Sequence, residues 1–584
     1  MANAAQQPEG LVDDPLDKGL HRSQMVLAAL LVLSILPLLG SIYGYAEIPF
    51  ITLHYFLRQD LPVLIGLILF VMALRAWRTR GHRSTVLERF FTTAQHPRPA
   101  MMALASLVVC TLGVWLLFGR FALSMDEFWA KADGVVLASG AGLVQIPAEW
   151  RDYALALSPT FARITPDGWW ASDYLPVNAA IQYIGGPLAS PLLTGFAVLV
   201  AADLARRLLP QEPLAPVFCA LLMITSGQLL ITGMTPYAMS AHLAFNLAWL
   251  WLFLRREWWS QLAAVVLPIF TVGLHQLVFF PLFAAPFLVD AWLTRRRVVA
   301  VMHGLAIGAS FLLWSAYDEL LYAALDAMPV VHSTGGTNTG TALLFTRFVT
   351  LLGDFSPLNI GLMSFNLIRF VTWQNVLLLP LILIAAAGFG RMPGVWRAML
   401  GGIVLMIAAM TVILAFQGHG WGYRYLHGQL GSACLLATYG YVRMCDEQAD
   451  RALARAMLGA ALLASLLLVP IRAWQAHAFA APYRAADAWI AARDVDVVLV
   501  DAPQHPYAID LVRNDPLLGN RPKRMTSLVL SDAQIEALCR KYRIAVFTDT
   551  EASRFGLHAL KADMPVRLRS PECAAAGQLP RAGS

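Results

Sequence analysis

MVLAALLVLSILPLLGSIY, residues 25–43, is a run of nineteen residues without a charged side chain. An α-helix needs about 20 mostly apolar residues to cross the hydrocarbon core of a bilayer, so this run predicts a membrane span. The 24 residues before it are polar, and the run is too long for the apolar part of a signal peptide. We therefore expect a membrane anchor at this position and no cleavable leader.

Apolar runs of this kind repeat along the chain, and we count about thirteen between residues 25 and 471. The composition agrees, because 58% of the 584 residues are hydrophobic and 14% are charged, whereas soluble chains carry about 25% charged residues. The mean hydropathy is +0.59. These values exclude a soluble globular protein and predict a mainly α-helical, polytopic membrane protein. The small net charge of +6 does not indicate a nucleic-acid partner.

The basic residues divide unevenly between the two sides of the membrane. If the N-terminus is cytoplasmic, the inner segments hold 20 Lys and Arg residues and the outer loops between spans hold eight, although the outer loops are longer. Short cytoplasmic loops collect Lys and Arg. We therefore predict a multi-pass protein of the bacterial inner membrane, with a cytoplasmic N-terminus and a periplasmic C-terminal domain.

The same map divides the chain into three parts. Residues 1–24 form a cytoplasmic segment, residues 25–473 the membrane domain, and residues 474–584 a small periplasmic domain. Two long outer loops, 120–175 and 321–372, interrupt the membrane domain. Channels and carriers place polar groups at mid-membrane on broken helices, whereas here the polar and aromatic residues gather in outer segments. This pattern favours chemistry at the outer surface on a membrane-embedded substrate.

The residues after 474 have a different character. VDVVLVDA (495–502) and RIAVFTD (543–549) are short apolar runs typical of buried strands. Ser531, with Gln534 three residues later, forms a capping-box signal for the start of a helix. A small α/β domain is the expected result.

This domain contains Cys539 and Cys573, while the other four cysteines lie in spans or on the inner side. An oxidising outer compartment would allow the two to form a disulfide, although spacing alone does not establish the geometry. His505 is near Asp501 and Asp510 in the sequence, but nothing there positions a nucleophile beside it. We therefore expect the domain to bind an acceptor or a partner, without a catalytic group of its own.

The first outer loop carries carboxylates at both ends. Asp126 and Glu127 are adjacent and follow the third span, and Asp173, Tyr174 and Pro176 stand where the next span begins. A carboxylate at the membrane surface can accept a proton from a hydroxyl or amide nucleophile. The alternative is a solvated acidic pair at the start of a loop.

These residues, in this order, resemble the membrane-embedded glycosyltransferases of the C-type fold, which include the protein O-mannosyltransferases and the bacterial aminoarabinose transferases of lipid A. The resemblance covers roughly residues 100–300 and is strongest at SMDEFW and SDYLP. It implies the C-type fold, a polyprenyl-phosphate sugar as donor, and a first-loop aspartate, here Asp126, that acts as general base or orients the acceptor. Many relatives have His-Pro-Pro where this chain has Tyr174, Leu175 and Pro176, so the resemblance leaves the subfamily and the acceptor open.

The lipid phosphate that leaves the sugar needs a cationic partner. Arg424, in QGHGWGYRYLHG (417–428), is the first candidate because a guanidinium pairs two phosphate oxygens and stays ionised near lipid. The alternative is an interfacial anchor within the aromatic belt. His419, Tyr425 and His427 are close to it and suit hydrogen bonds to a phosphate or sugar, with a structural role as the alternative for the histidines.

Other outer residues are expected to contact the donor. His275, in a tight outer turn, contacts the donor head group or satisfies the turn. In the second long outer loop, VVHSTGGTNTGTALLFTRF (330–348) is a Gly/Thr-rich loop followed by a helix-like stretch. It suits a flap over the donor, with Arg347 or Arg369 near the phosphate, rather than a nucleotide-phosphate loop. Asp173 and Tyr174 complete the predicted donor-binding set. A divalent ion at the acidic pair lacks support from ligand spacing, so we predict no metal and no other cofactor.

The predicted reaction moves a sugar from polyprenyl phosphate to a glycan, lipid or protein acceptor, with inversion at the anomeric carbon and Asp126 and Glu127 as catalytic residues. Membrane lipids are the remaining partners. A lipid-linked polysaccharide ligase or polymerase is one alternative, and it would depend on outer-loop arginines instead of an acidic pair. A transporter or flippase of lipid-linked sugars is the other, but the acids deep in the predicted spans, Asp203 and Asp290, lie close to inner-side arginines.

Overall fold

The computed structural model describes residues 15–43, 48–79, 98–140, 142–158, 160–324, 331–332, 353, 355–447 and 451–559. Within these residues, seven helical stretches are long and apolar enough to cross a membrane: Pro15–Ile42, Phe50–Ala76, Pro99–Leu116, Pro176–Leu208, Arg297–Ser315, Gly394–Ile413 and Leu458–Ala491. Five shorter apolar helices accompany them. The mainly α-helical class is confirmed, whereas the number thirteen is not.

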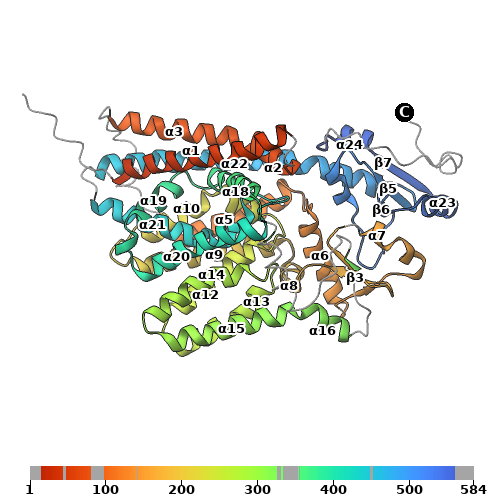
Figure 1. Ribbon diagram of the computed structural model, residues 1–584, viewed down its shortest axis with the longest axis horizontal. Coiled ribbons are helices and arrows are strands. Elements are labelled where there is room, and N and C mark those ends of the chain that lie inside the picture. The colour runs from red at the N-terminus through yellow and green to blue at the C-terminus, as the bar shows by residue number, and fades with distance from the viewer. Residues whose placement is uncertain are drawn as a thin grey trace, which may run out of the picture.

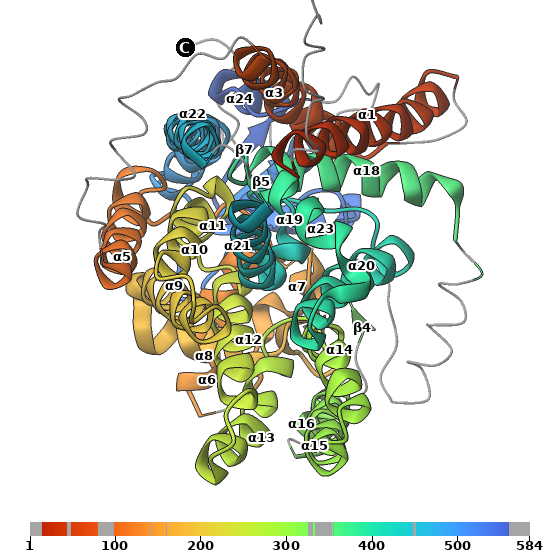
Figure 2. The same ribbon diagram turned by 90° about the vertical axis from the view of Figure 1, so that its left-hand side faces the viewer.

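The bounds of the helical elements around the membrane part are α1 (Pro15–Ile42), α2 (Phe50–Tyr55), η1 (Phe56–Asp60, a π-helix), α3 (Leu61–Thr79), α5 (Pro99–Leu116), α8 (Pro176–Gly185), η3 (Gly186–Leu188), α9 (Ala189–Leu208), α10 (Ala215–Ile224), α11 (Gly227–Thr232), α12 (Met239–Phe253), α13 (Trp258–Val272), α14 (Phe279–Leu293), α15 (Arg297–Ser315), α16 (Tyr317–Ala324), α18 (Pro357–Thr372), α19 (Leu378–Ala387), η4 (Phe389–Arg391), α20 (Gly394–Ile413), η5 (Arg424–Gln429), α21 (Leu430–Glu447) and α22 (Arg451–Ala491). Most of these helices run along the long axis of the molecule (Figure 1) and form a bundle in the view along that axis (Figure 2).

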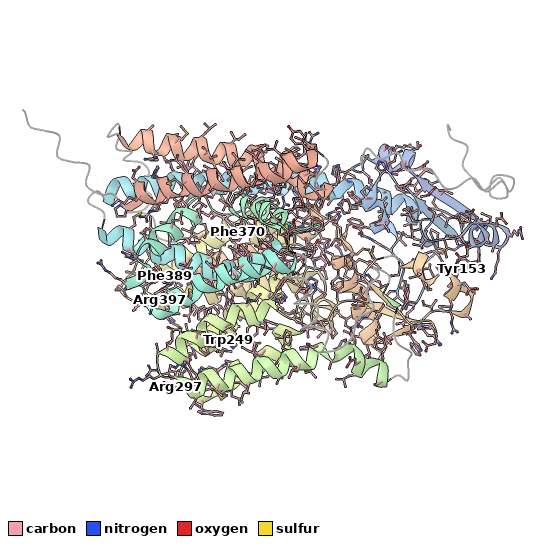
Figure 3. The ribbon with its side chains drawn as sticks, in the orientation of Figure 1. Tyr153, Trp249, Arg297, Phe370, Phe389 and Arg397 are labelled. Carbon is pink, nitrogen blue, oxygen red and sulfur yellow. The ribbon has the colours of Figure 1, made fainter. Side chains whose placement is uncertain are left out.

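Three labelled residues mark the two ends of this bundle. Arg297 and Arg397, both predicted to be inner residues, stand at one end, and Tyr153, in the first outer loop, stands at the other (Figure 3). We call the end with Tyr153 the outer end and the opposite one the inner end.

Two small sheets occupy the outer end. The first outer loop contributes α6 (Met125–Ala138), β1 (Val144–Gln145), η2 (Ala148–Tyr153), α7 (Ala154–Leu157), β2 (Ala162–Ile164) and β3 (Trp169–Ser172), which with β4 (Val331–His332) form an antiparallel sheet of order β1-β3-β2-β4. The C-terminal part contributes β5 (Val497–Asp501), η6 (Pro506–Leu511), β6 (Lys523–Thr526), α23 (Asp532–Lys541), β7 (Ile544–Thr548) and α24 (Asp549–Phe555), with a parallel sheet of order β6-β5-β7. The two predicted strands and the capping box of α23 are confirmed, and β6 is a third strand between them in the sequence.

The two outer parts share one hydrophobic core. Val136, Val144, Ile146, Trp150 and Trp170 of the first loop pack with Val497, Leu499, Met525, Leu538 and Val546 of the C-terminal part. Polar contacts cross the same boundary, because the indole of Trp170 donates to Pro516 O at 2.9 Å and Asn514 Nδ2 donates to Leu157 O at 2.9 Å. The C-terminal part is therefore built onto the first loop, and α22 runs unbroken through residue 474 to reach it.

Helix α18 occupies the last third of the segment predicted to be the second long outer loop. It starts at Ser356, whose hydroxyl accepts from Leu358 N at 3.3 Å, with Pro357 in the first turn. It packs on α1 and buries a face that includes Leu362, Phe365 and Ile368. The expectation of a loop over residues 357–372 is wrong because Asn366, Arg369 and Thr372 interrupt the apolar pattern, and their polar groups are satisfied inside the protein.

Candidate active site

A capping box sets the position of Asp126. Ser124 begins α6, its hydroxyl accepts from Glu127 N at 3.3 Å, and the Glu127 carboxylate accepts from the backbone N–H groups of Ser124, at 3.0 Å, and Leu123. Glu127 is 1% exposed, and burial raises the pKa of its carboxyl to about 7 although the two N–H groups lower it. Glu127 thus holds the start of the helix, and Asp126 projects from its first turn.

Asp126 joins three segments that are far apart in the sequence. Its carboxylate forms an ion pair with Arg424 and accepts a hydrogen bond from the hydroxyl of Tyr174. The Arg424 and Asp126 side chains are 9% and 13% exposed. Burial raises the pKa of the Asp126 carboxyl, but the Arg424 guanidinium, with the hydrogen bonds from Tyr174 and Arg424, outweighs burial and lowers it to about 2. Asp126 is therefore ionised at neutral pH.

Arg424 is presented by a glycine-rich loop that leads into η5. Gln417 closes this loop, because its Oε1 accepts from Arg424 N at 2.8 Å and its Nε2 donates to Gly422 O at 2.9 Å. Gly422 has φ +68°, and a Cβ there would lie 2.4 Å from Gln228. The Arg424 guanidinium carbon lies 5.2 Å from the ring centre of Tyr425, and Arg424 Nε is buried without a hydrogen-bond partner among the described residues.

A narrow recess with an accessible volume of about 20 Å³ opens beside the pair. Asp126 and Asp133 of α6 line it together with Tyr174, Tyr237 and His275. Asp133 lies seven residues after Asp126, on the same face of the helix. The Ser172 hydroxyl donates to Asp133 Oδ2, while Oδ1 is buried without a hydrogen-bond partner among the described residues. Burial raises the pKa of Asp133 to about 6, so the recess contains a second carboxylate that titrates closer to neutrality.

His275 and Asp173, two of the predicted donor-binding residues, lie near Tyr174. The His275 ring lies 5.0 Å from that of Tyr174, and burial lowers the pKa of His275 to about 4, so the imidazole is neutral at pH 7. Asp173 Oδ1 lies 4.0 Å from Arg163 Nε, and Arg163 also pairs with Asp318 and donates to Ser172 O. These contacts fix the end of β3, from which Tyr174 reaches Asp126.

The remaining predicted residues have other surroundings. His419 contacts the Tyr55 hydroxyl through Nδ1 at 3.5 Å and Asp510 through Nε2 at 3.4 Å. His427 is fully buried, 3.5 Å from Gln228 Nε2. Arg369 is buried in α18, where it pairs with Asp60 at 2.9 Å and donates to the carbonyls of Gly420 and Gly422. Arg347 lies outside the described residues.

Sequence reasoning missed three residues that belong to the site. Asp133 could have been found from its i, i+7 spacing to Asp126, and Tyr237 from its outer turn, where its hydroxyl contacts Ser124 Oγ at 2.8 Å. Arg513 had no local signal. From the C-terminal part it donates to the carbonyls of Ala122 and Leu123, directly before the helix that carries Asp126.

The C-terminal part holds one arrangement that contradicts the expectation from its sequence. His505 Nδ1 lies 2.7 Å from Asp549 Oδ1, and Ser553 Oγ lies 3.2 Å from His505 Nε2. A serine hydroxyl therefore lies beside His505. Both partners of His505, Asp549 and Ser553, come from α24, and neither Asp501 nor Asp510 takes part. Because Asp549 also accepts from Gln504 N at 3.0 Å, the chain of contacts fastens the loop after β5 to α24.

Within the described residues, no group of three or more His, Cys, Asp and Glu side chains is arranged to hold a metal ion. Cys539 is disulfide-bonded, and its predicted partner Cys573 lies outside the part of the chain that the structure describes.

No protein-family model and no curated protein matches the chain. Sixteen chains of solved structure match it, and two are crystal structures of ArnT from Cupriavidus metallidurans. The one bound to undecaprenyl phosphate is 12% identical with a TM-score of 0.42, and the match covers 71% of this chain and 84% of that chain. The apo structure is 11% identical with a TM-score of 0.37, covering 70% and 84%. ArnT is an aminoarabinose transferase.

Proposed function

We propose that the protein is a membrane-embedded glycosyltransferase that moves a sugar from a polyprenyl-phosphate donor to an acceptor at the outer end of the bundle, with inversion at the anomeric carbon. The observation that carries this proposal is the buried constellation of Asp126, Arg424 and Tyr174. Asp126 supplies an ionised carboxylate that can bind the acceptor, and Arg424 supplies a guanidinium that can bind a phosphate. The two groups are in contact with each other and lie beside a recess.

The low pKa of Asp126 decides which of its two expected roles fits better. A carboxyl group with a pKa of about 2 is a weak base at neutral pH, because general bases work best when their pKa lies near the working pH. It is, however, a strong hydrogen-bond acceptor for an acceptor hydroxyl or amine. Asp126 then orients the nucleophile, and Asp133, with its pKa of about 6, is the better-matched proton acceptor in the same recess.

The reaction follows from these charges. The acceptor oxygen or nitrogen forms a bond to the anomeric carbon while the bond from that carbon to the phosphate oxygen breaks, and the acceptor proton moves to a recess carboxylate. The polyprenyl phosphate leaves with the bonding electrons, and Arg424 stabilises the negative charge that develops on it. Arg424 suits this step because its Nε is free of a partner among the described residues.

A second cavity provides space for the donor. It has an accessible volume of about 270 Å³ and is lined by residues of the same two helices, α6 and α8, together with Arg120 and the turn around Thr235. Lys131, which donates to Arg120 O at 2.8 Å, and the exposed Tyr183 also line it. Two basic residues and an exposed aromatic ring suit the phosphate and the prenyl chain of a lipid.

The experiment is a transfer assay with purified protein, a polyprenyl-phosphate sugar and membrane extract as the source of acceptor. Asp126→Asn should abolish transfer, because the amide cannot carry the negative charge that orients the nucleophile. Asp152→Asn, an exposed carboxylate in the same loop, is the matched control and should retain it. Full activity of the Asp126 variant would refute the assignment, as would loss of activity in both variants alike.

A further inference from the structure

A large groove opens on the other side of the outer end, between the α2–η1 segment and α22. Its accessible volume is about 640 Å³. The residues that characterise its lining are Phe50, His54, Leu57, Arg58, Trp474 and His558. Two of these are large apolar side chains facing out, since Leu57 is 46% exposed and Trp474 is 68% exposed.

If the start of α22 marks the inner membrane surface, the groove lies at the depth where the hydrocarbon of a bilayer meets the polar head groups. Trp474 follows the start of α22 at Arg451 by 23 residues, which in a helix is about 34 Å and close to the thickness of the hydrocarbon core. Tryptophan is enriched at this interface. On the opposite wall, the chain makes one π-helical turn, η1 (Phe56–Asp60), within an otherwise α-helical stretch. Arg58 stands on that turn.

Arg58 gives the groove a positive charge without a carboxylate partner among the described residues. Arg58 is exposed, and no ion pair or hydrogen bond joins it to any described residue. In contrast, Arg369 and Arg472 nearby share the carboxylate of Asp60. The ring of His558 lies 4.1 Å from that of His54, and His558 Nε2 is buried without a hydrogen-bond partner among the described residues.

The lining contains one arginine, two histidines and two glutamines, and no acidic residue among the described positions. A phosphate group matches this set, since Arg and imidazole N–H groups donate to its oxygens. The exposed indole and leucine beside these groups match acyl chains. The chemistry of the groove is therefore that of an anionic amphiphile whose charge lies next to its apolar part.

We propose that this groove binds an anionic glycerophospholipid of the bilayer, with the phosphate at Arg58, His54 and His558 and the acyl chains along Leu57 and Trp474. The polyprenyl donor is a poorer fit, because the groove is lined by α2, η1 and α22, whereas α6 and α8 line both the recess at Asp126 and the cavity proposed for the donor. Phe479 stands between the groove and His419, with its ring 5.5 Å from the histidine. The site is distinct from the proposed transfer centre and does not depend on the proposed function.

The test is native mass spectrometry of the full-length protein in detergent, titrated with dioleoyl phosphatidylglycerol or with dioleoyl phosphatidylcholine. The wild type should bind the anionic lipid more tightly. Arg58→Ala should weaken phosphatidylglycerol binding about fivefold, which corresponds to about 1 kcal/mol per basic residue near a membrane surface, and Arg58→Lys should restore it. Trp474→Ala should weaken both lipids alike, and Arg256→Ala, an exposed arginine outside the groove, should leave binding unchanged.

Equal binding of the two lipids, or an Arg58→Ala variant that binds like the wild type, would overturn the proposal. Displacement of phosphatidylglycerol from the wild type, but not from Arg58→Ala, by an equimolar polyprenyl phosphate would assign the groove to the donor and would also overturn it. Mass spectrometry measures lipid binding without any sugar transfer. A negative result in the transfer assay therefore does not contradict lipid binding in the groove, and a negative lipid-binding result does not contradict the proposed sugar transfer.

Discussion

Replacing Asp126 by Asn would leave the buried guanidinium of Arg424 without its carboxylate. Breaking a buried ion pair by removal of one partner typically costs about 3–5 kcal/mol, because the remaining charge is uncompensated. The Asn amide still offers an oxygen to the Tyr174 hydroxyl, and Arg424 keeps the ring of Tyr237, whose centre is 5.5 Å away. We therefore expect the lower end of the range, a loss of about 3 kcal/mol in the free energy of unfolding.

The double variant Asp126→Asn with Arg424→Gln separates stability from chemistry. It removes the orphaned charge as well as the pair, so we expect it to recover about 2 of the 3 kcal/mol, a coupling within the range seen for residues in contact. Both variants should lack transfer activity, because neither retains the carboxylate. Stability thus returns in the double variant while activity does not.

The free energy of unfolding is measured by equilibrium unfolding with sodium dodecyl sulfate in mixed micelles, followed by tryptophan fluorescence. Asp152→Asn serves as the control and should stay within about 0.5 kcal/mol of the wild type, as surface substitutions usually do. If Asp126→Asn were as stable as the wild type, or if the two changes were additive, the two side chains would not form a buried pair. If the double variant transferred sugar, the role of Asp126 would be refuted.

Three further changes test the surroundings of the pair. Tyr174→Phe removes a hydrogen bond to the carboxylate of Asp126 and should lower kcat about tenfold, equivalent to about 1.4 kcal/mol, and unchanged kcat would show that the phenol is dispensable. Asp133 must be deprotonated to accept a proton, so wild-type activity should fall as the pH drops through about 6, and an Asp133→Asn variant that kept this acidic limb would contradict the assignment. Arg513→Met leaves three buried carbonyls, those of Ala122, Leu123 and Asp510, without their side-chain donor and should lower kcat about tenfold or more with little change in KM. Arg521→Met, at a residue with a 55% exposed side chain, should change neither kcat nor KM, and an equal loss in both variants would exclude a positioning role.

The start of α23 could be predicted because its signal is local, a capping box formed by Ser531 and Gln534. A second capping box, formed by Ser124 and Glu127, begins α6, but the sequence alone does not separate the roles of Asp126 and Glu127. The structure assigns different roles to the adjacent acids, since the capping geometry turns Glu127 back toward the backbone of residues 123 and 124 and directs Asp126 to Arg424. Adjacent positions on a helix point to different sides, and only the contact to residue 424 identifies the one that faces the recess.

Other features had no local signal. Helix α18 was not predicted because a buried arginine reads as polar in any hydropathy window, although Asp60, 309 residues earlier, neutralises it. The packing of the C-terminal part on the first loop was equally hidden, since the partners Trp170 and Pro516 are separated by 346 positions. Arg513 also had no local signal. It contributes to the site by donating to the carbonyls of Ala122 and Leu123, and a sequence pattern does not show such contacts.

The conformation of the loop that carries Arg424 depends on helices far from the segment that resembles a known family. This loop is rich in glycine and makes few regular hydrogen bonds, so its carbonyls need donors from elsewhere. Arg369 supplies them to Gly420 at 2.7 Å and to Gly422 at 3.1 Å. The side chain of Arg369 is held by Asp60 and by the ring of Tyr55, 3.8 Å from its guanidinium carbon.

Arg472 of α22 also reaches Asp60, at 3.5 Å, and donates to Thr372 O at 2.7 Å. Asp60, Arg369 and Arg472 therefore form one buried network of charges next to the loop. The network joins the helices between residues 50 and 79 to α18 and to α22. Because an unpaired charge at such a place is costly, the pairing of Asp60 with both arginines favours this arrangement, in which Arg369 holds the carbonyls of the loop that presents Arg424 to Asp126. The resemblance over residues 100–300 accounts for the carboxylate of the proposed site, whereas the position of its cation is set by the parts of the chain on either side of that segment.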